Sequence, residues 1–349
     1  LVPGYATIGW AAPILVLILR LLQGLALGGE YGGAATYVAE HAPKGQRGFW
    51  TSWIQTTATL GLFLALGVII LIRSSQGVEK FSAEWGGWRY PFWISLLLVG
   101  VSILIRMRMS ESPMFSKLKT EGKTSINPLK ESFGHKGNFK MVLLALFGAV
   151  MGQGVVWYTG QFYAQSFLET KCKLDFEQSR TILLWAIAAA TPFFVFFGWL
   201  SDRIGRKWIL MTGMLLAVLT YRPIFGYFID HSIALDPTAT TIVLTSDLYW
   251  KFVGLVFLLI FYVTMVYGPI AAFLVELFPT RIRYTSMSLP YHIGNGVFGG
   301  LVPFIGLLLS TSLPGDPLVG LWYPIGITAV CFLIGVLYLD NKQDENVMD

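Results

Sequence analysis

Residues 31–52 read YGGAATYVAEHAPKGQRGFWTS, and residues 267–288 read YGPIAAFLVELFPTRIRYTSMS. The two stretches align without a gap at a fixed offset of 236 residues, and they share the pattern Y-G-x2-A-x4-E-x2-P-x3-R-x4-S. Each copy runs from the end of one apolar segment through a short charged turn into the next apolar segment. A long pattern that recurs within one chain indicates an internal repeat, so we expect two halves with related folds.

The composition is that of a membrane protein. Of the 349 residues, 54% are hydrophobic and 13% are charged, and the mean hydropathy is +0.61, whereas ordinary soluble domains have about 25% charged residues. About 20 consecutive apolar residues span the hydrocarbon layer as an α-helix. Nine segments are long enough, namely 13–41, 48–73, 88–107, 139–168, 178–200, 207–229, 249–278, 285–311 and 319–339. We therefore predict an all-α polytopic membrane protein.

The position of the repeat among these nine segments predicts how the chain is divided. Three predicted helices precede the helix that carries the second copy, and two follow it, which makes six. No predicted helix precedes the first copy. We therefore expect a twelve-helix plan without its first three helices. The expected parts are a partial N-terminal bundle in residues 1–107, a cytoplasmic linker in 108–138 and a C-terminal six-helix bundle in 139–349.

The distribution of Lys and Arg predicts the orientation in the membrane, because cytoplasmic loops collect these residues. Alternate loops, beginning with 41–48 and including the long linker, hold 16 basic residues, and the other set of loops holds 7. The first set is therefore expected inside the cell. This orientation places the C-terminus in the cytoplasm.

Two motifs resemble those of a known family. Residues 198–207 read GWLSDRIGRK, which resembles the signature loop G-x3-D-R-x-G-R-[RK] of the major facilitator superfamily. Residues 20–24 read RLLQG, which resembles the R-x-x-Q-G motif of proton-coupled members. The longer runs 20–40 and 275–300 look like the metabolite–proton symporter family, whose members carry osmolytes such as proline and betaine and organic acids such as citrate, 2-oxoglutarate and shikimate.

The resemblance implies a two-bundle fold and the proton-coupled symport of a small organic acid or zwitterion across the cytoplasmic (inner) membrane by alternating access. The expected partners are the substrate, protons and the lipid bilayer, with no nucleic acid, and we expect a monomer. The missing first third of the family pattern leaves the substrate undecided. The alternatives are a transporter-like membrane sensor and a facilitative carrier or passive channel without coupling.

Two charges interrupt the first apolar segment. Arg20 and Glu30, with Gln23 and Tyr31, share one face of a continuous helix at 100° per residue, and a charge at bilayer depth is costly. Arg20 and Glu30 are ten residues apart, about 15 Å along the axis, so they cannot pair directly. Both have valine counterparts in the second copy. We interpret Arg20 as the holder of an anionic group and Glu30 as a proton-carrying carboxylate, with a hydrogen-bonded brace as the alternative for Glu30.

Polar side chains inside other predicted helices are further candidates, because amides and hydroxyls at membrane depth need partners or water. Some of them recur at four-residue steps, which favours either a cavity wall or hydrogen bonds between helices. Pro269 should loosen its helix, because proline lacks a backbone donor. For His292 a substrate or proton role and a satisfied interhelical bond both stay open. The full set of substrate- or proton-binding candidates is Arg20, Gln23, Glu30, Tyr31, Gln153, Trp157, Tyr158, Gln161, Tyr267, His292 and Asn295.

Charged residues at the predicted cytoplasmic turns indicate a conformational latch. The family resemblance implies that carboxylate–guanidinium pairs hold one conformation there, and such pairs bias a two-state equilibrium. By analogy we expect Glu40 to pair with Arg47, and Glu276 with Arg283, at the two repeated turns. The latch candidates are Glu40, Arg47, Gly198, Asp202, Arg203, Gly205, Arg206, Lys207, Glu276 and Arg283.

No enzyme signature is present in the sequence. We find no G-x-S-x-G, HExxH, CxxC, Walker or dinucleotide-binding motif, so we expect no catalytic residues, no metal site and no cofactor. Cys172 and Cys331 show no spacing typical of a disulfide or metal site, and we interpret both as structural.

Overall fold

The computed structural model describes residues 2–27, 30–108, 113–122, 125, 127–235, 239–313 and 315–341. Within these ranges the chain is helical and forms no strand beyond one isolated parallel bridge, between Leu174 and Ile242. Eight helices of the described part are long and apolar enough to cross a membrane, and Ala11–Gly24 is a shorter apolar helix. The predicted all-α polytopic fold is confirmed.

The first part of the chain contains the segment that the sequence predicts as one helix over 13–41. The structure describes it as two helices, and residues 28 and 29 between them lie outside the described residues. The elements of this part are α1 (Tyr5–Ile8), α2 (Ala11–Leu27), α3 (Glu30–His41), α4 (Arg47–Gln76), α5 (Val78–Ser82), the 3₁₀ helix η1 (Gly87–Arg89) and α6 (Tyr90–Arg108). Apolar side chains on α2 and α6 are largely exposed, as expected of surfaces that face lipid.

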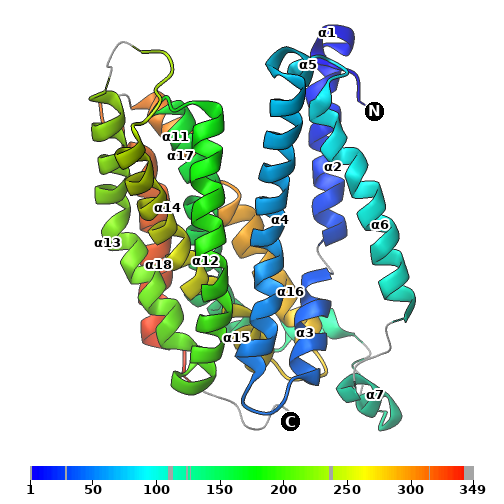
Figure 1. Cartoon of the computed structure of the whole chain (residues 1–349). Helices are drawn as coiled ribbons and strands as arrows, with labels where there is room; N and C mark the ends of the chain where they lie inside the picture. The colour runs from blue at the N-terminus through cyan, green and yellow to red at the C-terminus, as the bar shows by residue number, and fades with distance from the viewer. Residues whose placement is uncertain are drawn as a thin grey trace.

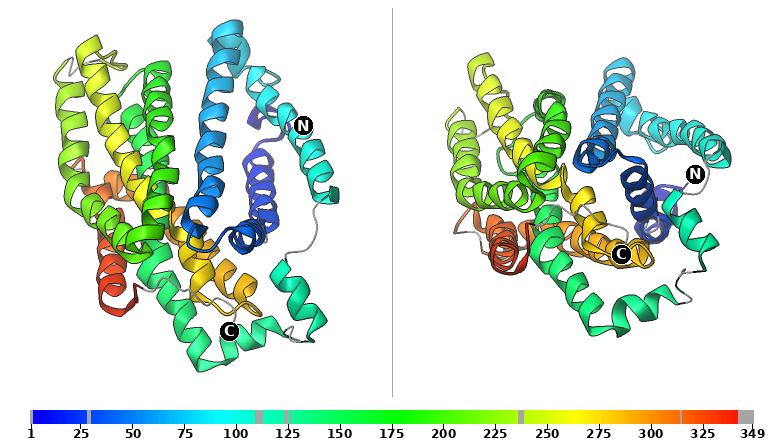
Figure 2. Two further views of the ribbon diagram at one scale, coloured as in Figure 1. Left: turned by 60° about the horizontal axis from the view of Figure 1, so that its bottom comes forward. Right: turned by 90° about the horizontal axis from the view of Figure 1, so that it is seen from below.

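Two short helices connect the first part to the second. They are α7 (Pro113–Thr120) and α8 (Pro128–Gly134). Asn127 caps α8, since its side chain accepts a hydrogen bond from the backbone N–H of Lys130 at 3.0 Å. Seen from below in Figure 2, these helices run along the outside of the bundle.

The second part contains six spans, several of them built from consecutive segments. Its elements are α9 (Lys136–Ala145), the π-helix η2 (Leu146–Val150), α10 (Met151–Tyr158), the π-helix η3 (Thr159–Tyr163), α11 (Ala164–Thr170), α12 (Phe176–Ile204), α13 (Arg206–Ile233), α14 (Ser246–Tyr267), α15 (Ile270–Leu277), α16 (Arg283–Ile293), the π-helix η4 (Gly294–Gly299), α17 (Val302–Ser312), the 3₁₀ helix η5 (Val319–Leu321) and α18 (Trp322–Tyr338). The helix ends at Tyr267 and resumes at Ile270, so the loosening predicted at Pro269 is confirmed.

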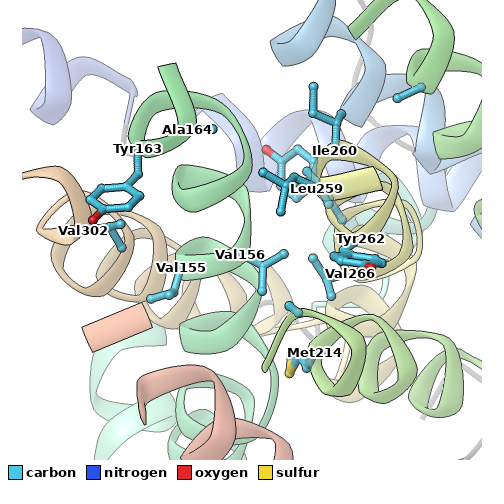
Figure 3. Packing of buried hydrophobic residues seen from close by; sticks show 14 of the residues in the cluster. Val155, Val156, Tyr163, Ala164, Met214, Leu259, Ile260, Tyr262, Val266 and Val302 are labelled. Atoms are coloured by element: carbon cyan, nitrogen blue, oxygen red, sulfur yellow. The ribbon is translucent and has the colours of Figure 1, made fainter. Parts of the chain in front are cut away.

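The hydrophobic core lies mainly in the second part. The span from α9 to α11 runs through its middle, and Figure 3 shows Val156 of α10 among Leu259 and Val266 of α14 and Met214 of α13. All four side chains are fully buried. At about 25 cal/mol per Å² of apolar surface, burying each such side chain contributes about 1.5–3 kcal/mol. This core holds the α9–α11 span, which carries four of the candidates, Gln153, Trp157, Tyr158 and Gln161.

The two parts meet along α4 and α12, which lie side by side in Figure 1. A Cβ atom on Gly48 would collide with the backbone oxygen of Gly198, and one on Gly198 would collide with Ser52. Glycine at both positions therefore allows the two helix backbones to touch.

The molecule has two ends that differ in their contacts. We call the end with the turns 42–46 and 278–282 the latch end; it lies at the bottom of Figure 1. We call the opposite end, where α11 ends and α12 begins, the cavity end. At the latch end α3 packs against α15 and α16.

Candidate functional site

A carboxylate of the signature loop binds the start of α4. Asp202, near the end of α12, accepts hydrogen bonds from the backbone N–H groups of Gly48 and Phe49, each at 2.8 Å. These N–H groups belong to the first turn of α4, where they have no partner within the helix and where the helix dipole favours a negative charge. Asp202 therefore joins the second part of the chain to the first at the latch end.

Arg206 connects Asp202 to the second repeated turn. Its Nη1 lies 2.7 Å from Oδ1 of Asp202, and its Nη2 and Nε lie 2.9 and 3.2 Å from the two carboxylate oxygens of Glu276. Nη1 also donates to Oγ of Ser201 at 2.8 Å. All three charged side chains are nearly inaccessible to solvent. A planar guanidinium suits this arrangement because it can bind carboxylates with two parallel hydrogen bonds.

The ion pairs at the repeated turns differ from those expected. Nη1 of Arg283 lies 2.9 Å from Oε1 of Glu40, with the two side chains only 1% and 3% exposed. The expected pairs Glu40–Arg47 and Glu276–Arg283 are therefore wrong in their partners. The reason is the packing of α3 on α16, which places Glu40 against the first residue of α16. Arg47 is partly exposed, and no acidic side chain of the described residues pairs with it.

The other signature-loop residues have separate roles. Gly205 adopts φ +95°, and a Cβ there would collide with the side chain of Asn341. Lys207 is buried and donates to two backbone carbonyls at the end of α18, at 2.8 and 2.6 Å, which suits a cation at a helix C-terminus. Arg203 is exposed and lies over the ring of Trp199 at 4.0 Å. Arg203 and Lys207 thus pair with no carboxylate of the described residues, unlike the arrangement expected for a latch.

Four residues at repeat-related positions meet between the two parts, and we call them the tyrosine cluster. Tyr31 stacks on Tyr291, with ring centroids 3.6 Å apart and planes 7° apart. Gln55 donates from Nε2 to the hydroxyl of Tyr31 at 2.6 Å, and the hydroxyls of Tyr267 and Tyr291 lie 2.7 Å apart. The offset of 236 relates Tyr31 to Tyr267 and Gln55 to Tyr291. The cluster therefore lies where equivalent positions of the two copies come together.

An amide pair lies beside this cluster. Gln153 of α10 and Asn295 of η4 donate to each other's side-chain oxygens, both at 3.2 Å, and Asn295 also donates to the carbonyl of Tyr291 at 3.0 Å. The sequence left two interpretations open for these amides, a cavity wall or hydrogen bonds between helices. Gln153 and Asn295 form hydrogen bonds between helices. His292 is partly buried, with its ring edge-on to Tyr291 at 5.4 Å.

A cavity of about 470 Å³ lies along the span from α10 to α11, beside α17. Its lining residues are Trp157, Tyr158, Phe162, Gln165, Ser166, Glu169 and Pro303. The ring of Trp157 lies 6.2 Å from that of Tyr267, which connects the cavity wall to the cluster. The indole N–H of Trp157 is buried without a hydrogen-bond acceptor among the described residues.

Gln153, Trp157, Gln161 and Gln165 recur at four-residue steps along the α9–α11 span, but their side chains do not all face the same side. Gln161 is fully buried, and neither its Nε2 nor its Oε1 has a partner in the described part of the chain. It lies in the π-helix η3, where the wider turn changes which residues face the cavity. The stripe predicted from α-helical spacing therefore separates, with Trp157 and Gln165 lining the cavity and Gln161 turned into the protein.

The charges of the first segment lie outside this site. Arg20 is exposed on α2 and donates to Oε1 of Gln23 at 2.9 Å. Glu30 forms an ion pair with Arg106 of α6, and both side chains are about half exposed. The expectation that these charges share one face with Tyr31 in a watery pocket is not met. Each finds a nearby partner instead, one turn away on the same helix or on the end of α6.

Several residues of the site were not among the sequence candidates. Gln55 and Tyr291 could have been found, because the repeat offset relates them to each other and each lies one apolar segment after a candidate tyrosine. Glu169 of the cavity wall is paired with Arg180 at 2.6 Å. No pattern in the sequence indicates that pair, which forms between the end of one span and the start of the next.

The chain matches two family models. Residues 1–225 match the Major Facilitator Superfamily model, and residues 115–339 match the Sugar (and other) transporter model. Together these matches cover nearly the whole chain, including the repeat, the signature loop and the cavity.

Similar proteins carry transporter names. A Haemophilus influenzae protein named as a metabolite transport protein is 33% identical over 99% of this chain and 74% of its own length. A Staphylococcus aureus protein named as a proline/betaine transporter is 30% identical over 96% of this chain and 67% of its own length. The alpha-ketoglutarate permease of Escherichia coli is 30% identical over 96% of this chain and 72% of its own length. With its repeat, its signature loop and its helical spans, the chain belongs to the major facilitator superfamily of multi-pass membrane transporters and is not an enzyme.

Proposed function

We propose that the protein is a secondary active transporter that moves a small organic acid or zwitterionic metabolite across the cytoplasmic membrane together with protons. The observation that carries this proposal is the contrast between the two ends. One buried ion pair, between Arg283 and Glu40, and two backbone hydrogen bonds to Asp202 join the two parts at the latch end, and a cavity lies on the side of the cavity end. A carrier held shut on one side, with a site accessible from the other, has this arrangement.

The latch contacts suit one of two alternating states. Asp202 and Arg283 each bind a group from the other part of the chain, so both contacts must break if the parts separate at this end. A ligand shifts such an equilibrium only by its difference in affinity for the two states. We propose that the moving bodies are residues 1–107 and 139–349, with 108–138 as the linker, in a monomer. The latch end and the C-terminus would face the cytoplasm.

The cavity lining suits a small solute that carries both apolar and charged groups. Trp157, Tyr158 and Phe162 present aromatic rings, whose faces attract ammonium groups, and Gln165 offers an amide. The names of the relatives include proline/betaine and alpha-ketoglutarate, which are a zwitterionic class and a dicarboxylate. We propose solutes of these two classes as the first candidates.

The proton-coupled part of the proposal is supported by the R-x-x-Q-G resemblance at residues 20–24. The alternative is a facilitative carrier or a sensor on the same scaffold. The test uses the purified full-length protein in proteoliposomes with a pH-sensitive dye inside. Addition of glycine betaine or 2-oxoglutarate should produce saturable uptake and acidify the lumen. Saturable uptake without a pH change supports the facilitative carrier, and binding without uptake supports the sensor.

A pair of tryptophan variants connects this test to the cavity. Trp157→Ala should lower uptake at subsaturating solute by about tenfold, the equivalent of about 1.4 kcal/mol, because it removes a wall and a free N–H donor. Trp185→Ala is the matched control, since Trp185 is 55% exposed on α12 and does not line the cavity. Equal loss in both variants would reject the cavity as the transport site.

A further inference from the structure

Two arginines from different parts of the chain lie against one aromatic ring at the cavity end. The guanidinium carbon of Arg73, near the end of α4, is 3.7 Å from the ring centroid of Phe176, the first residue of α12. The guanidinium carbon of Arg180, one turn later on α12, is 3.3 Å from the same centroid. We call these three residues and Glu169 the arginine cluster.

The charges of the arginine cluster do not balance. Glu169 pairs with Arg180 at 2.6 Å, and the same carboxylate oxygen accepts from Gln165 at 3.2 Å and from the hydroxyl of Ser179 at 3.1 Å. No acidic side chain of the described residues pairs with Arg73. One guanidinium charge of the cluster therefore has no counterion within the described chain.

Two N–H donors without an acceptor also indicate that the arginine cluster lacks an anion. The Nε atoms of both Arg73 and Arg180 are buried and have no acceptor among the described residues. A buried donor without a partner is unfavourable, and more so when it is charged. The stacked ring holds each guanidinium in place, so its planar fork is already oriented for an anion.

The arginine cluster adjoins the cavity, because Glu169 belongs to both and Gln165, which donates to Glu169, also lines the cavity. We propose that Arg73 and Arg180 form a binding site for the carboxylate group of the transported solute at the rim of the cavity. The aromatic wall at Trp157 then holds the rest of the molecule. This inference rests on the proposed function and adds to it a residue of the first part, so that the solute bridges both parts on the open side.

The test measures binding of 2-oxoglutarate to the purified full chain in nanodiscs of phosphatidylcholine. Arg73→Gln should raise the Kd by at least about tenfold while the melting temperature stays unchanged, because charge-assisted bonds to carboxylates are among the strongest that side chains form. The Kd of Arg73→Lys should lie between those of the wild type and Arg73→Gln, since lysine keeps the positive charge but lacks the planar guanidinium fork. The matched control is Lys80→Gln, an exposed cation at the same end.

The other outcomes each contradict a defined statement. Unchanged binding in Arg73→Gln, while the wild-type chain binds, would overturn this inference alone. Equal loss of melting temperature and binding would make Arg73 a structural contact of α4 with α12, and would also overturn it. If phosphatidylglycerol added to the nanodisc displaces 2-oxoglutarate from the wild-type chain, the site belongs to a lipid headgroup. A wild-type chain that binds neither 2-oxoglutarate nor glycine betaine would overturn the proposed function as well.

Discussion

Loss of the Glu40 carboxylate should open the latch end. In Glu40→Gln the guanidinium of Arg283, which is 1% exposed, keeps its charge and loses the carboxylate that lies 2.9 Å from its Nη1. Unit charges about 4 Å apart attract by about 4 kcal/mol at an effective dielectric constant of about 20. Removing one partner of a buried pair costs about 3–5 kcal/mol in measured cases. Hydration can restore Arg283 only when the two parts separate, so this cost falls on the closed state.

The expected shift follows from these values. A loss of about 3 kcal/mol changes the ratio of closed to open molecules by about a hundredfold, since about 1.4 kcal/mol corresponds to a factor of ten. The double variant Glu40→Gln/Arg283→Gln removes both charges and leaves two amides that can bond to each other. It should return most of the population to the closed state.

Spin labels can measure this population. Lys44 on the first part and Arg203 on the second are both exposed at the latch end. Cysteines placed at these two positions can carry spin labels, and double electron–electron resonance then measures the distance between them. The native Cys172 and Cys331 are fully buried and should label little. Glu40→Gln should move the distance distribution toward longer values, and the exposed Glu79→Gln should not. An unchanged distribution in Glu40→Gln, with the same melting temperature, would refute the role given to the buried pair.

Three further outcomes are expected. Gly48→Ala should lower stability by about 1–3 kcal/mol through overpacking against α12, whereas Gly61→Ala on the same helix meets open space and should cost nothing in a thermal melt. Asn295→Ala should cost about 1–3 kcal/mol because Gln153 is left buried without its partner, and a double change of both residues to Leu should cost less. Burial raises the pKa of Cys172 to about 12, so maleimide labelling of the folded protein should be slow at pH 8 and should accelerate as the pH rises toward that value. Equal labelling of folded and unfolded protein at pH 8 would contradict this.

The spans could be predicted from sequence because the cost of exposing a polar backbone to lipid leaves long apolar helices as the main solution. The repeat also pointed to Glu40, Glu276 and Arg283, which form ion pairs, and to Arg47, with which no acidic side chain of the described residues pairs. The partners could not be predicted. Glu40 and Arg283 are 243 residues apart, and only the packing of α3 on α16 brings them together.

The polar candidates show a second limit. Counting by 100° per residue assumes one continuous α-helix, and the structure departs from it where η3 widens the turn at Gln161. We assumed that Arg20, as an isolated charge, must face a cavity. Its guanidinium instead donates a hydrogen bond to Gln23 on its own helix. Local hydrogen bonding and helix irregularity are decided by neighbours that spacing alone does not give.

The bonds from Asp202 to α4 end on main-chain atoms, and this has a consequence for evolutionary comparison. A carboxylate that binds N–H groups is indifferent to which side chain stands at position 49, whereas position 48 has no room for a Cβ atom. Substitutions at position 49 in other lineages would leave the contact intact and would produce no correlated change at position 202. Methods that infer contacts from covarying columns would therefore overlook this junction, although it joins α4 to α12.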